Sequence, residues 1–142
     1  MKTIVETLEL QHRALEQEVA LLQRALAAKD PEGVRAGLDK LEAMLVAHLK
    51  LENAEFYPAF LAKAQGDPAL QTVSLFQQNL GRIGEGVLAF FGRWKGPLTL
   101  ARLDALQPEW GSTLKLLAGR LRDEDKILHP IHRRLFAGDQ SI

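Results

Sequence analysis

The sequence predicts an all-α fold, namely an antiparallel four-helix bundle with up-down-up-down topology. Apolar residues recur at spacings of three and four through four long stretches, which is the period of amphipathic helices. Short breaks containing Gly, Pro and Asp separate most of these stretches, so successive helices are expected to pack antiparallel. No stretch shows the alternation of a half-buried strand. The length suits one domain with a core, and we expect residues 1–142 to form that single domain.

The first helix is predicted over residues 3–28. Its buried seam consists of Ile4, Leu8, Leu15, Val19, Leu22 and Leu26. His12 fills the one gap in this seam, so an imidazole is expected in the core. Asp30 and Pro31 then start the next helix, because an aspartate side chain caps a helix N-terminus and a proline is tolerated in the first turn.

The second helix is predicted over residues 31–64. Its seam runs through Val34, Leu38, Leu41, Leu45, His48 and Glu52, and then either Glu55 or Phe56. Pro58 lies inside this helix and predicts a kink, because a proline removes one backbone hydrogen bond and crowds the preceding turn. Gly66 marks the end of this segment, and Asp67 with Pro68 is expected to open the third helix.

The third helix is predicted over residues 68–94 and contains Gly81, Gly84 and Gly86. Each glycine costs roughly 1 kcal/mol relative to alanine in a helix interior. The run GRIGEG has the glycine content of a phosphate-binding loop, but no strand precedes it and the apolar period continues through it. Close packing of helices, or a local bend, is the better interpretation of these glycines.

The last helix is predicted over residues 108–136, starting at Pro108. Residues 95–107 form a connection with room for a short helix of its own. The seam of the last helix includes either Arg120 or Leu121, followed by Glu124. The tail, residues 137–142, is expected to be frayed.

The composition excludes several classes of protein. Eighteen basic and eighteen acidic residues give a formal net charge of zero without a block of like charge, so neither nucleic acid nor a membrane surface is expected as a partner. The chain contains no cysteine, which excludes disulfides and thiolate metal sites. The N-terminus is too polar for a signal peptide, and no apolar run reaches the roughly 18 residues of a membrane span. We therefore expect a soluble, cytoplasmic protein.

Four polar residues are predicted to meet in the core. His12 and His48 are each eighteen residues from Asp30, so they face each other across an antiparallel hairpin. Glu52 lies one turn after His48 on the same helix face, and Glu124 reaches a similar height on the last helix. Two imidazoles and two carboxylates suit a divalent ion such as iron, zinc or manganese. The alternative is that these histidines are hydrogen-bonded structural residues of the core.

These residues resemble the motifs of the hemerythrin-like (HHE cation-binding) family. The resemblance rests on His12, on the run from His48 and Glu52 to Glu55 and Pro58, and on Glu124 six residues before Pro130. The family forms antiparallel four-helix bundles that hold two irons and bind oxygen or sense oxygen, redox state or iron. The resemblance implies that His12 and His48 would bind one iron and that the two glutamates would bridge to a second.

The resemblance fails at the second iron. The predicted third helix contains no histidine, and Arg120 stands ten residues before Pro130, where His48 stands ten residues before Pro58. One hypothesis is that the Arg120 guanidinium occupies the second metal position and neutralises both glutamates. The alternative is that Arg120 extends to the surface while Leu121 takes the seam position. The sequence thus predicts a degenerate diiron site that holds one ion or none. Iron is the expected ion, and zinc and manganese are the alternatives.

Three functions fit this pattern. The first is a hemerythrin-like metal-binding protein that senses or handles oxygen, redox state or iron, with dioxygen or another protein as a further partner. The second is a metal-free bundle that acts as a protein-interaction or regulatory module. The third is an enzyme with a mononuclear iron site, for which no substrate-binding signature is visible. We expect that the protein is not an enzyme and has no catalytic residues.

Overall fold

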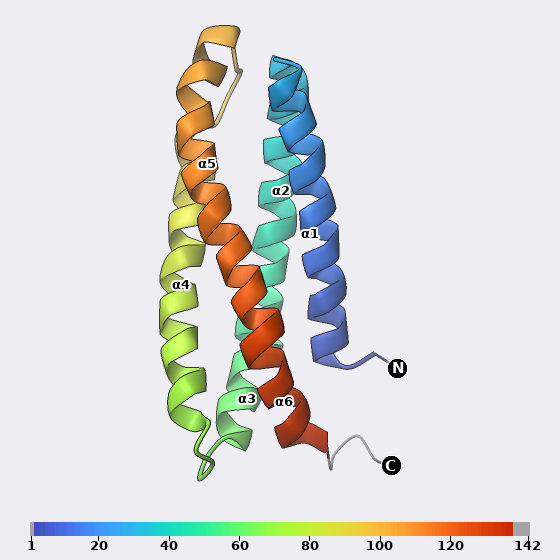
Figure 1. The fold of residues 1–142 in the computed structure, drawn as a ribbon, viewed down its shortest axis with the longest axis vertical. Coiled ribbons are helices and arrows are strands. Elements are labelled where there is room, and N and C mark those ends of the chain that lie inside the picture. The colour runs from blue at the N-terminus through green and yellow to red at the C-terminus, as the bar shows by residue number, and fades with distance from the viewer. Residues whose placement is uncertain (1, 138–142) are drawn as a thin grey trace.

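The structure, a computed structural model that describes residues 2–137, is a bundle of four long helical rods (Figure 1). Its elements are α1 (Ile4–Ala27), α2 (Pro31–Leu51), η1 (Glu52–Phe56), α3 (Tyr57–Lys63), α4 (Leu70–Arg93), α5 (Leu100–Asp123), η2 (Glu124–Leu128) and α6 (His129–Phe136). The rods run antiparallel, with α3 continuing α2 and α6 continuing α5 at the end where α1 begins. The predicted all-α bundle is confirmed. No described helix has the length and apolar character needed to cross a membrane.

The first helices begin where the sequence predicts. The Thr3 hydroxyl accepts a hydrogen bond from the Glu6 backbone N–H at 3.1 Å and caps α1. The Asp30 carboxylate accepts one from the Gly33 N–H at 3.1 Å and caps α2, with Pro31 in the first turn. Helix α4 begins at Leu70, two residues later than predicted, because Asp67 caps the turn before it through the Ala69 N–H.

The last long helix begins earlier than predicted. Helix α5 starts at Leu100, where Thr99 accepts a hydrogen bond from the Arg102 N–H at 3.2 Å, and Pro108 lies inside the helix. The expected connection over residues 95–107 is therefore much shorter than predicted. Leu103, Leu106 and Trp110 are all buried, so an apolar seam runs through the proline and packing outweighs its local cost. Of the tail predicted to fray, residues 138–142 lie outside the described residues.

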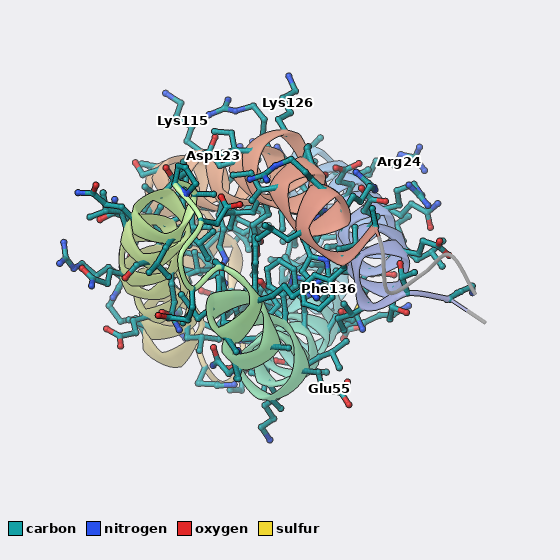
Figure 2. The ribbon with its side chains drawn as sticks, turned by 90° about the horizontal axis from the view of Figure 1, so that it is seen from below. Arg24, Glu55, Lys115, Asp123, Lys126 and Phe136 are labelled. Carbon is teal, nitrogen blue, oxygen red and sulfur yellow. The ribbon has the colours of Figure 1, made fainter. Side chains whose placement is uncertain are left out.

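A polar layer divides the apolar core into two clusters. The larger cluster includes Leu15, Leu22, Leu38, Leu45, Phe90, Trp110 and Leu117. The smaller one includes Val5, Leu8, Phe56, Phe60, Val73 and Leu128. Along α1, His12 lies between the residues of the two clusters, and His48 and Glu52 hold the same place on the second rod. Viewed along the bundle, charged side chains such as Glu55 and Lys115 project outward, while Phe136 points toward the interior (Figure 2).

Candidate metal centre

Two π-helical turns place the buried glutamates. Glu52 is the first residue of η1 and Glu124 the first of η2, and in each turn the glutamate carbonyl accepts a hydrogen bond from the N–H five residues later. Pro58 and Pro130 follow these glutamates by six residues, and each proline ring crowds the carbonyl four residues before it. That carbonyl lies inside the widened turn in both cases. The predicted disruption at Pro58 is thus a π-helical turn, a feature that is frequent at functional sites.

The four residues predicted to meet do come together. His12, His48, Glu52 and Glu124, here called the central cluster, are each at most 1% exposed, and their ligand atoms all lie within 4.8 Å of one another. The two Nε2 atoms are 3.1 Å apart. Glu52 Oε1 lies 2.6 Å from His48 Nε2, and Glu124 Oε1 lies 3.5 Å from His12 Nε2. Side chains from α1, α2, η1 and η2 therefore converge on a single point.

Both imidazoles are oriented from outside the central cluster. His12 Nδ1 lies 2.8 Å from Asp125 Oδ1, and His48 Nδ1 lies 2.6 Å from Gln11 Oε1. A carboxylate and an amide oxygen only accept hydrogen bonds, so each Nδ1 must carry the hydrogen and donate it. Each neutral ring then presents the bare lone pair of Nε2 to the centre. This is the tautomer that binds a metal through Nε2 with a hydrogen-bonded partner behind the ring.

The carboxylates of the central cluster lack donors. None of the four carboxylate oxygens of Glu52 and Glu124 has a hydrogen-bond partner among the described residues. Burial raises the pKa of Glu124, and the neighbouring Glu52 adds to the rise. The Nε2 lone pairs of the two histidines and the two carboxylates thus meet without a hydrogen-bond donor between them. A divalent cation bound by all four groups would satisfy this arrangement.

Arg120 lies beside the carboxylates and not at the surface. Only 4% of its surface is exposed, and its Nη2 and Nε are each 3.5 Å from Glu52 Oε1 and Glu124 Oε1, respectively. Its Nη1 donates to the backbone carbonyl of Leu80 on α4. Leu121 is buried as well, so the two residues that the sequence offered as alternatives for the seam both lie inside. The guanidinium therefore lies between the two glutamates and the backbone of α4.

The two histidines of the central cluster differ in basicity. Burial lowers the pKa of His12, but the hydrogen bond and charge of Glu124, together with Asp125, outweigh it and leave the pKa raised. Burial lowers the pKa of His48 to about 4, and the proximity of His12 and Arg120 adds to this effect. When no metal is bound, a proton on His12 can be donated from Nε2 to the neutral His48 across the 3.1 Å separation.

A comparison with known protein families identifies the family to which the chain belongs. The sequence profile of the hemerythrin HHE cation binding domain matches residues 3–132. The chain belongs to the hemerythrin family. No curated protein and no solved structure matches the chain at a significant level. Membership of this family supports metal binding by the chain in general. Which residues bind the ion is inferred from the geometry of the central cluster.

Within the hemerythrin bundle, α4 takes no part in either candidate group of metal ligands formed by the described residues. The donor set of the central cluster fits one divalent ion. His12, His48, Glu52 and Glu124 would hold it, and an iron ion there would supply redox chemistry or affinity for oxygen. Arg120 lies 3.5 Å from a carboxylate oxygen of each of the two glutamates that the family resemblance implies would bridge to a second ion.

The residues near the central cluster of this hemerythrin domain differ in their exposure. His132 is 3% exposed and stacks on Phe136 at 4.2 Å and on Phe56 at 5.2 Å between ring centroids. Of the two residues that the sequence offers for the seam after Glu52, Glu55 is exposed and points outward (Figure 2). Phe56 takes the seam position because the π-helical turn shifts the register by one residue. Tyr57 is buried, and burial near Glu124 and Glu52 raises the pKa of its hydroxyl.

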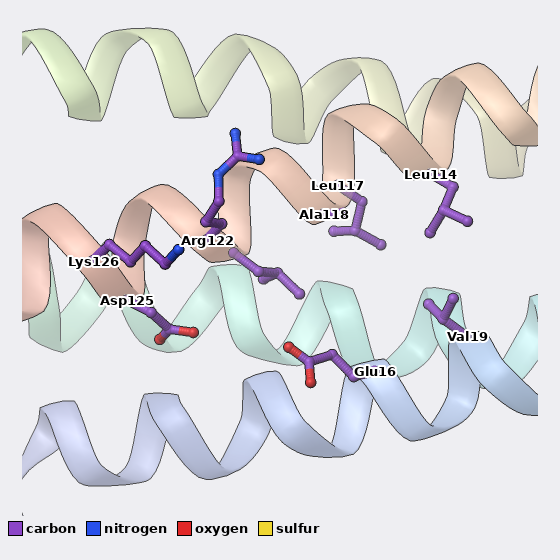
Figure 3. A pocket seen from close by; sticks show the side chains of 9 residues that line it. Glu16, Val19, Leu114, Leu117, Ala118, Arg122, Asp125 and Lys126 are labelled. Carbon is purple, nitrogen blue, oxygen red and sulfur yellow. The ribbon is translucent and has the colours of Figure 1, made fainter.

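Sequence reasoning missed Gln11 and Asp125, the partners behind the two imidazoles. Each is adjacent in sequence to a residue of the central cluster, next to His12 and Glu124, which is the only signal that could have pointed to them. Asp125 also lies at one end of a cavity of about 330 Å³ between α1 and α5, lined mainly by Val19, Leu114, Leu117 and Leu121 (Figure 3). The residue behind His12 is thus open to solvent from this side of the bundle.

Proposed function

We propose that this hemerythrin-family protein binds a single divalent metal ion through His12, His48, Glu52 and Glu124, and that it senses or handles oxygen, redox state or iron. The observation that carries the proposal is the orientation of the imidazoles. Their Nδ1 hydrogens are donated outward to Asp125 and Gln11, which leaves both Nε2 lone pairs 3.1 Å apart beside two carboxylates without hydrogen-bond donors. A cation resolves this concentration of lone pairs and negative charge.

Iron is the ion we favour, with zinc and manganese as alternatives that offer the same charge. The donor set of two imidazoles and two carboxylates suits all three ions. The position of Arg120 favours one ion over two, because the guanidinium would repel a second cation beside it. In addition, α4 has no residue in either candidate group of metal ligands among the described residues. Reversible oxygen carriage by a pair of irons is therefore not part of this proposal.

A second candidate is a metal-free bundle that acts by binding another protein. The observation in its favour is the same guanidinium, which already supplies one positive charge between Glu52 and Glu124. A proton shared within the central cluster could balance the remaining charge. That the protein is not an enzyme stays a prediction, which the burial of the four ligands supports. A cytoplasmic location and a dioxygen or protein partner stay predictions.

Metal analysis separates the two candidates. The protein is purified without chelator, and the metal content per chain is measured for the wild type and for His12→Ala, His48→Ala and the control His132→Phe. We expect about one ion per chain in the wild type and in the control, and a loss of most of it in the two alanine variants. An absence of copurified metal, together with a melting temperature that neither chelator nor added iron changes, would favour the metal-free alternative.

A further inference from the structure

A second group of potential ligands lies outside the central cluster. Glu9 of α1, Asp125 of η2 and His129, the first residue of α6, form what we call the outer cluster, whose ligand atoms all lie within 4.8 Å of one another. His129 Nδ1 is 3.2 Å from Asp125 Oδ1 and 3.5 Å from Glu9 Oε2. The first helix and two consecutive elements of the last rod thus bring one imidazole and two carboxylates to a single point.

The imidazole of His129 is buried without a hydrogen bond. Its exposed fraction is 0%, and neither Nδ1 nor Nε2 has a hydrogen-bond partner among the described residues. The ring stacks on His12 at 5.5 Å between centroids and meets Phe56 edge-on at 5.7 Å. A buried polar atom without a partner destabilises the folded state, because it has given up its hydrogen bonds to water. Since Nδ1 lies close to two carboxylate oxygens without a hydrogen bond to either, a ligand shared by all three groups would satisfy it.

The internal repeat of the chain shows that packing alone does not require a histidine here. Glu52 is followed five residues later by Tyr57 and then Pro58, and Glu124 is followed in the same way by His129 and Pro130. Tyr57 and His129 both come directly after a π-helical turn, and both are buried. An aromatic ring fills this position in both halves. What His129 adds to the ring is a nitrogen that can coordinate, placed next to two acidic side chains.

We propose that Glu9, Asp125 and His129 form a second metal site, separate from the central cluster, which binds a zinc ion of its own. Zinc accepts nitrogen and oxygen ligands at about 2.0–2.1 Å in a tetrahedron, whose edges are then about 3.3 Å long. The separations of 3.2 and 3.5 Å between His129 Nδ1 and the two carboxylate oxygens match that edge. Glu9 and Asp125 are partly exposed, at 23% and 36%, so water can complete the tetrahedron.

Arg133 is the group that competes with the ion. Its Nη2 lies 2.5 Å from Glu9 Oε2, and about half of its side chain is exposed. The long side chain can move into solvent at little cost, because exposed ion pairs contribute little to stability. Zinc brings two positive charges to two carboxylates and a buried imidazole, whereas the guanidinium brings one charge to a single carboxylate. The ion is therefore the better partner for the whole outer cluster.

Asp125 links the two sites. Its Oδ1 accepts the hydrogen bond from His12 Nδ1 and lies next to His129 Nδ1. A carboxylate that supports a ligating histidine tunes the affinity of the metal which that histidine holds. Occupation of the outer cluster would draw charge from Asp125 and so change the affinity of the central cluster. This makes Asp125 unsuitable for testing either site alone, and Glu9 and His129 the better choices.

The test is the stoichiometry of zinc binding. The full chain is stripped with a chelator and titrated calorimetrically with zinc ions, as wild type and as Glu9→Gln, His129→Phe and His48→Ala. Glu6→Gln, an exposed glutamate nearly one turn before Glu9, is the matched control for loss of charge. We expect two zinc ions per chain for the wild type and the control. Glu9→Gln and His129→Phe should each lose one ion or weaken its binding at least tenfold.

The outcomes separate this proposal from the function proposed for the central cluster. If only the outer cluster binds zinc, the wild type takes up one ion that Glu9→Gln removes and His48→Ala leaves in place. If only the central cluster binds it, His48→Ala removes the single ion and Glu9→Gln has no effect, which overturns the outer site. Circular dichroism checks that His129→Phe is folded, and Glu9→Gln, which alters a partly exposed side chain, gives the answer if it is not.

Discussion

Gly84 leaves the space that the guanidinium of Arg120 fills. A Cβ atom built at Gly84 would lie 2.5 Å from Arg120 Nη1, nearer than nonbonded atoms approach. One turn earlier on the same helix, the carbonyl of Leu80 accepts the hydrogen bond from that nitrogen. A small residue on α4 and a large cation on α5 are therefore complementary. Helix α4, which has no residue in either candidate group of metal ligands among the described residues, thus leaves room for Arg120.

Gly84→Ala should destabilise the protein by about 1–3 kcal/mol, because the added methyl group forces the buried guanidinium away from Leu80 and the two glutamates. Gly81→Ala is the matched control on the same helix, since a Cβ there meets nothing within 4 Å. Alanine favours a helix over glycine, so the control should be about 0.5–1 kcal/mol more stable than the wild type. Denaturant unfolding measures both. Equal effects of the two substitutions would mean that Arg120 does not need the space.

Arg120→Met should make the protein depend on metal for its stability. The substitution leaves two buried carboxylates without the cation beside them, and removing one partner of a buried ion pair costs about 3–5 kcal/mol. A bound ion would supply the missing positive charge. We therefore expect a lower melting temperature in chelator and a larger rise on adding zinc or iron than the wild type shows. A rise of the same size in both proteins would contradict a shared electrostatic role for Arg120 and the ion.

Arg120→His should raise the metal content above that of the wild type. The imidazole would replace a fixed positive charge with a neutral ligand one turn before Glu124, at the position that corresponds to His48 before Glu52. The two glutamates could then bridge two ions. Elemental analysis of protein loaded with iron gives the stoichiometry, with Arg122→His as a control because Arg122 is exposed. An unchanged ratio of iron to protein would show that Arg120 does not hold the second metal position.

Gln11→Leu should weaken metal binding about 10- to 100-fold without changing any ligand. The Gln11 amide oxygen accepts the Nδ1 hydrogen of His48 at 2.6 Å and so fixes the ring with its Nε2 toward the centre. Gln11→Glu keeps an acceptor of the same length and should retain the affinity. Competition with a coloured chelator measures the dissociation constants. If leucine and glutamate bind the ion equally well, the outward hydrogen bond does not orient His48.

The sequence was sufficient to predict the bundle and the central cluster. Both follow from regular spacing: the seams repeat every three or four residues, and equal distances from the Asp30 turn place His12 opposite His48. The start of α5 was not predictable in this way, because Pro108 has the character of a first-turn residue and only the buried seam on both sides shows otherwise. The π-helical turns were missed for a related reason, since a proline predicts a disruption but not its form.

The hydrogen-bond partners could not be deduced from spacing either. Gln11, Asp125 and the Leu80 carbonyl meet their partners through side-chain rotamers and the rotation of each rod about its axis. A count of residues from a turn fixes height along the bundle and leaves that rotation undetermined. The two alternatives for Arg120, a buried cation or a surface residue, differ in that rotation alone. The height of each residue along the bundle was therefore predictable from the sequence, whereas the direction in which its side chain points is known only from the structure.

The stability of the protein should fall as the pH drops from about 6.5 toward 4, in part through His132. Burial between Phe56 and Phe136, helped by the nearby charges of His129 and Arg133, lowers the pKa of His132 to about 4. The unfolded chain takes up a proton at its ordinary pKa of about 6.5, whereas the folded protein does so only near pH 4. Within this window the unfolded state binds more protons, so acid favours unfolding, by on the order of 3 kcal/mol for this residue at pH 4.

His132→Phe isolates this contribution, because phenylalanine can stack on the same two rings and does not titrate in this range. The free energy of unfolding, measured with denaturant in the presence of a chelator between pH 4 and 8, should change less steeply with pH in the variant. At pH 8 the two proteins should differ only by the change in packing. His48, whose pKa is also lowered to about 4, leaves a residual slope in both proteins. Parallel pH profiles for the wild type and the variant would show that His132 remains free to take up a proton in the folded state.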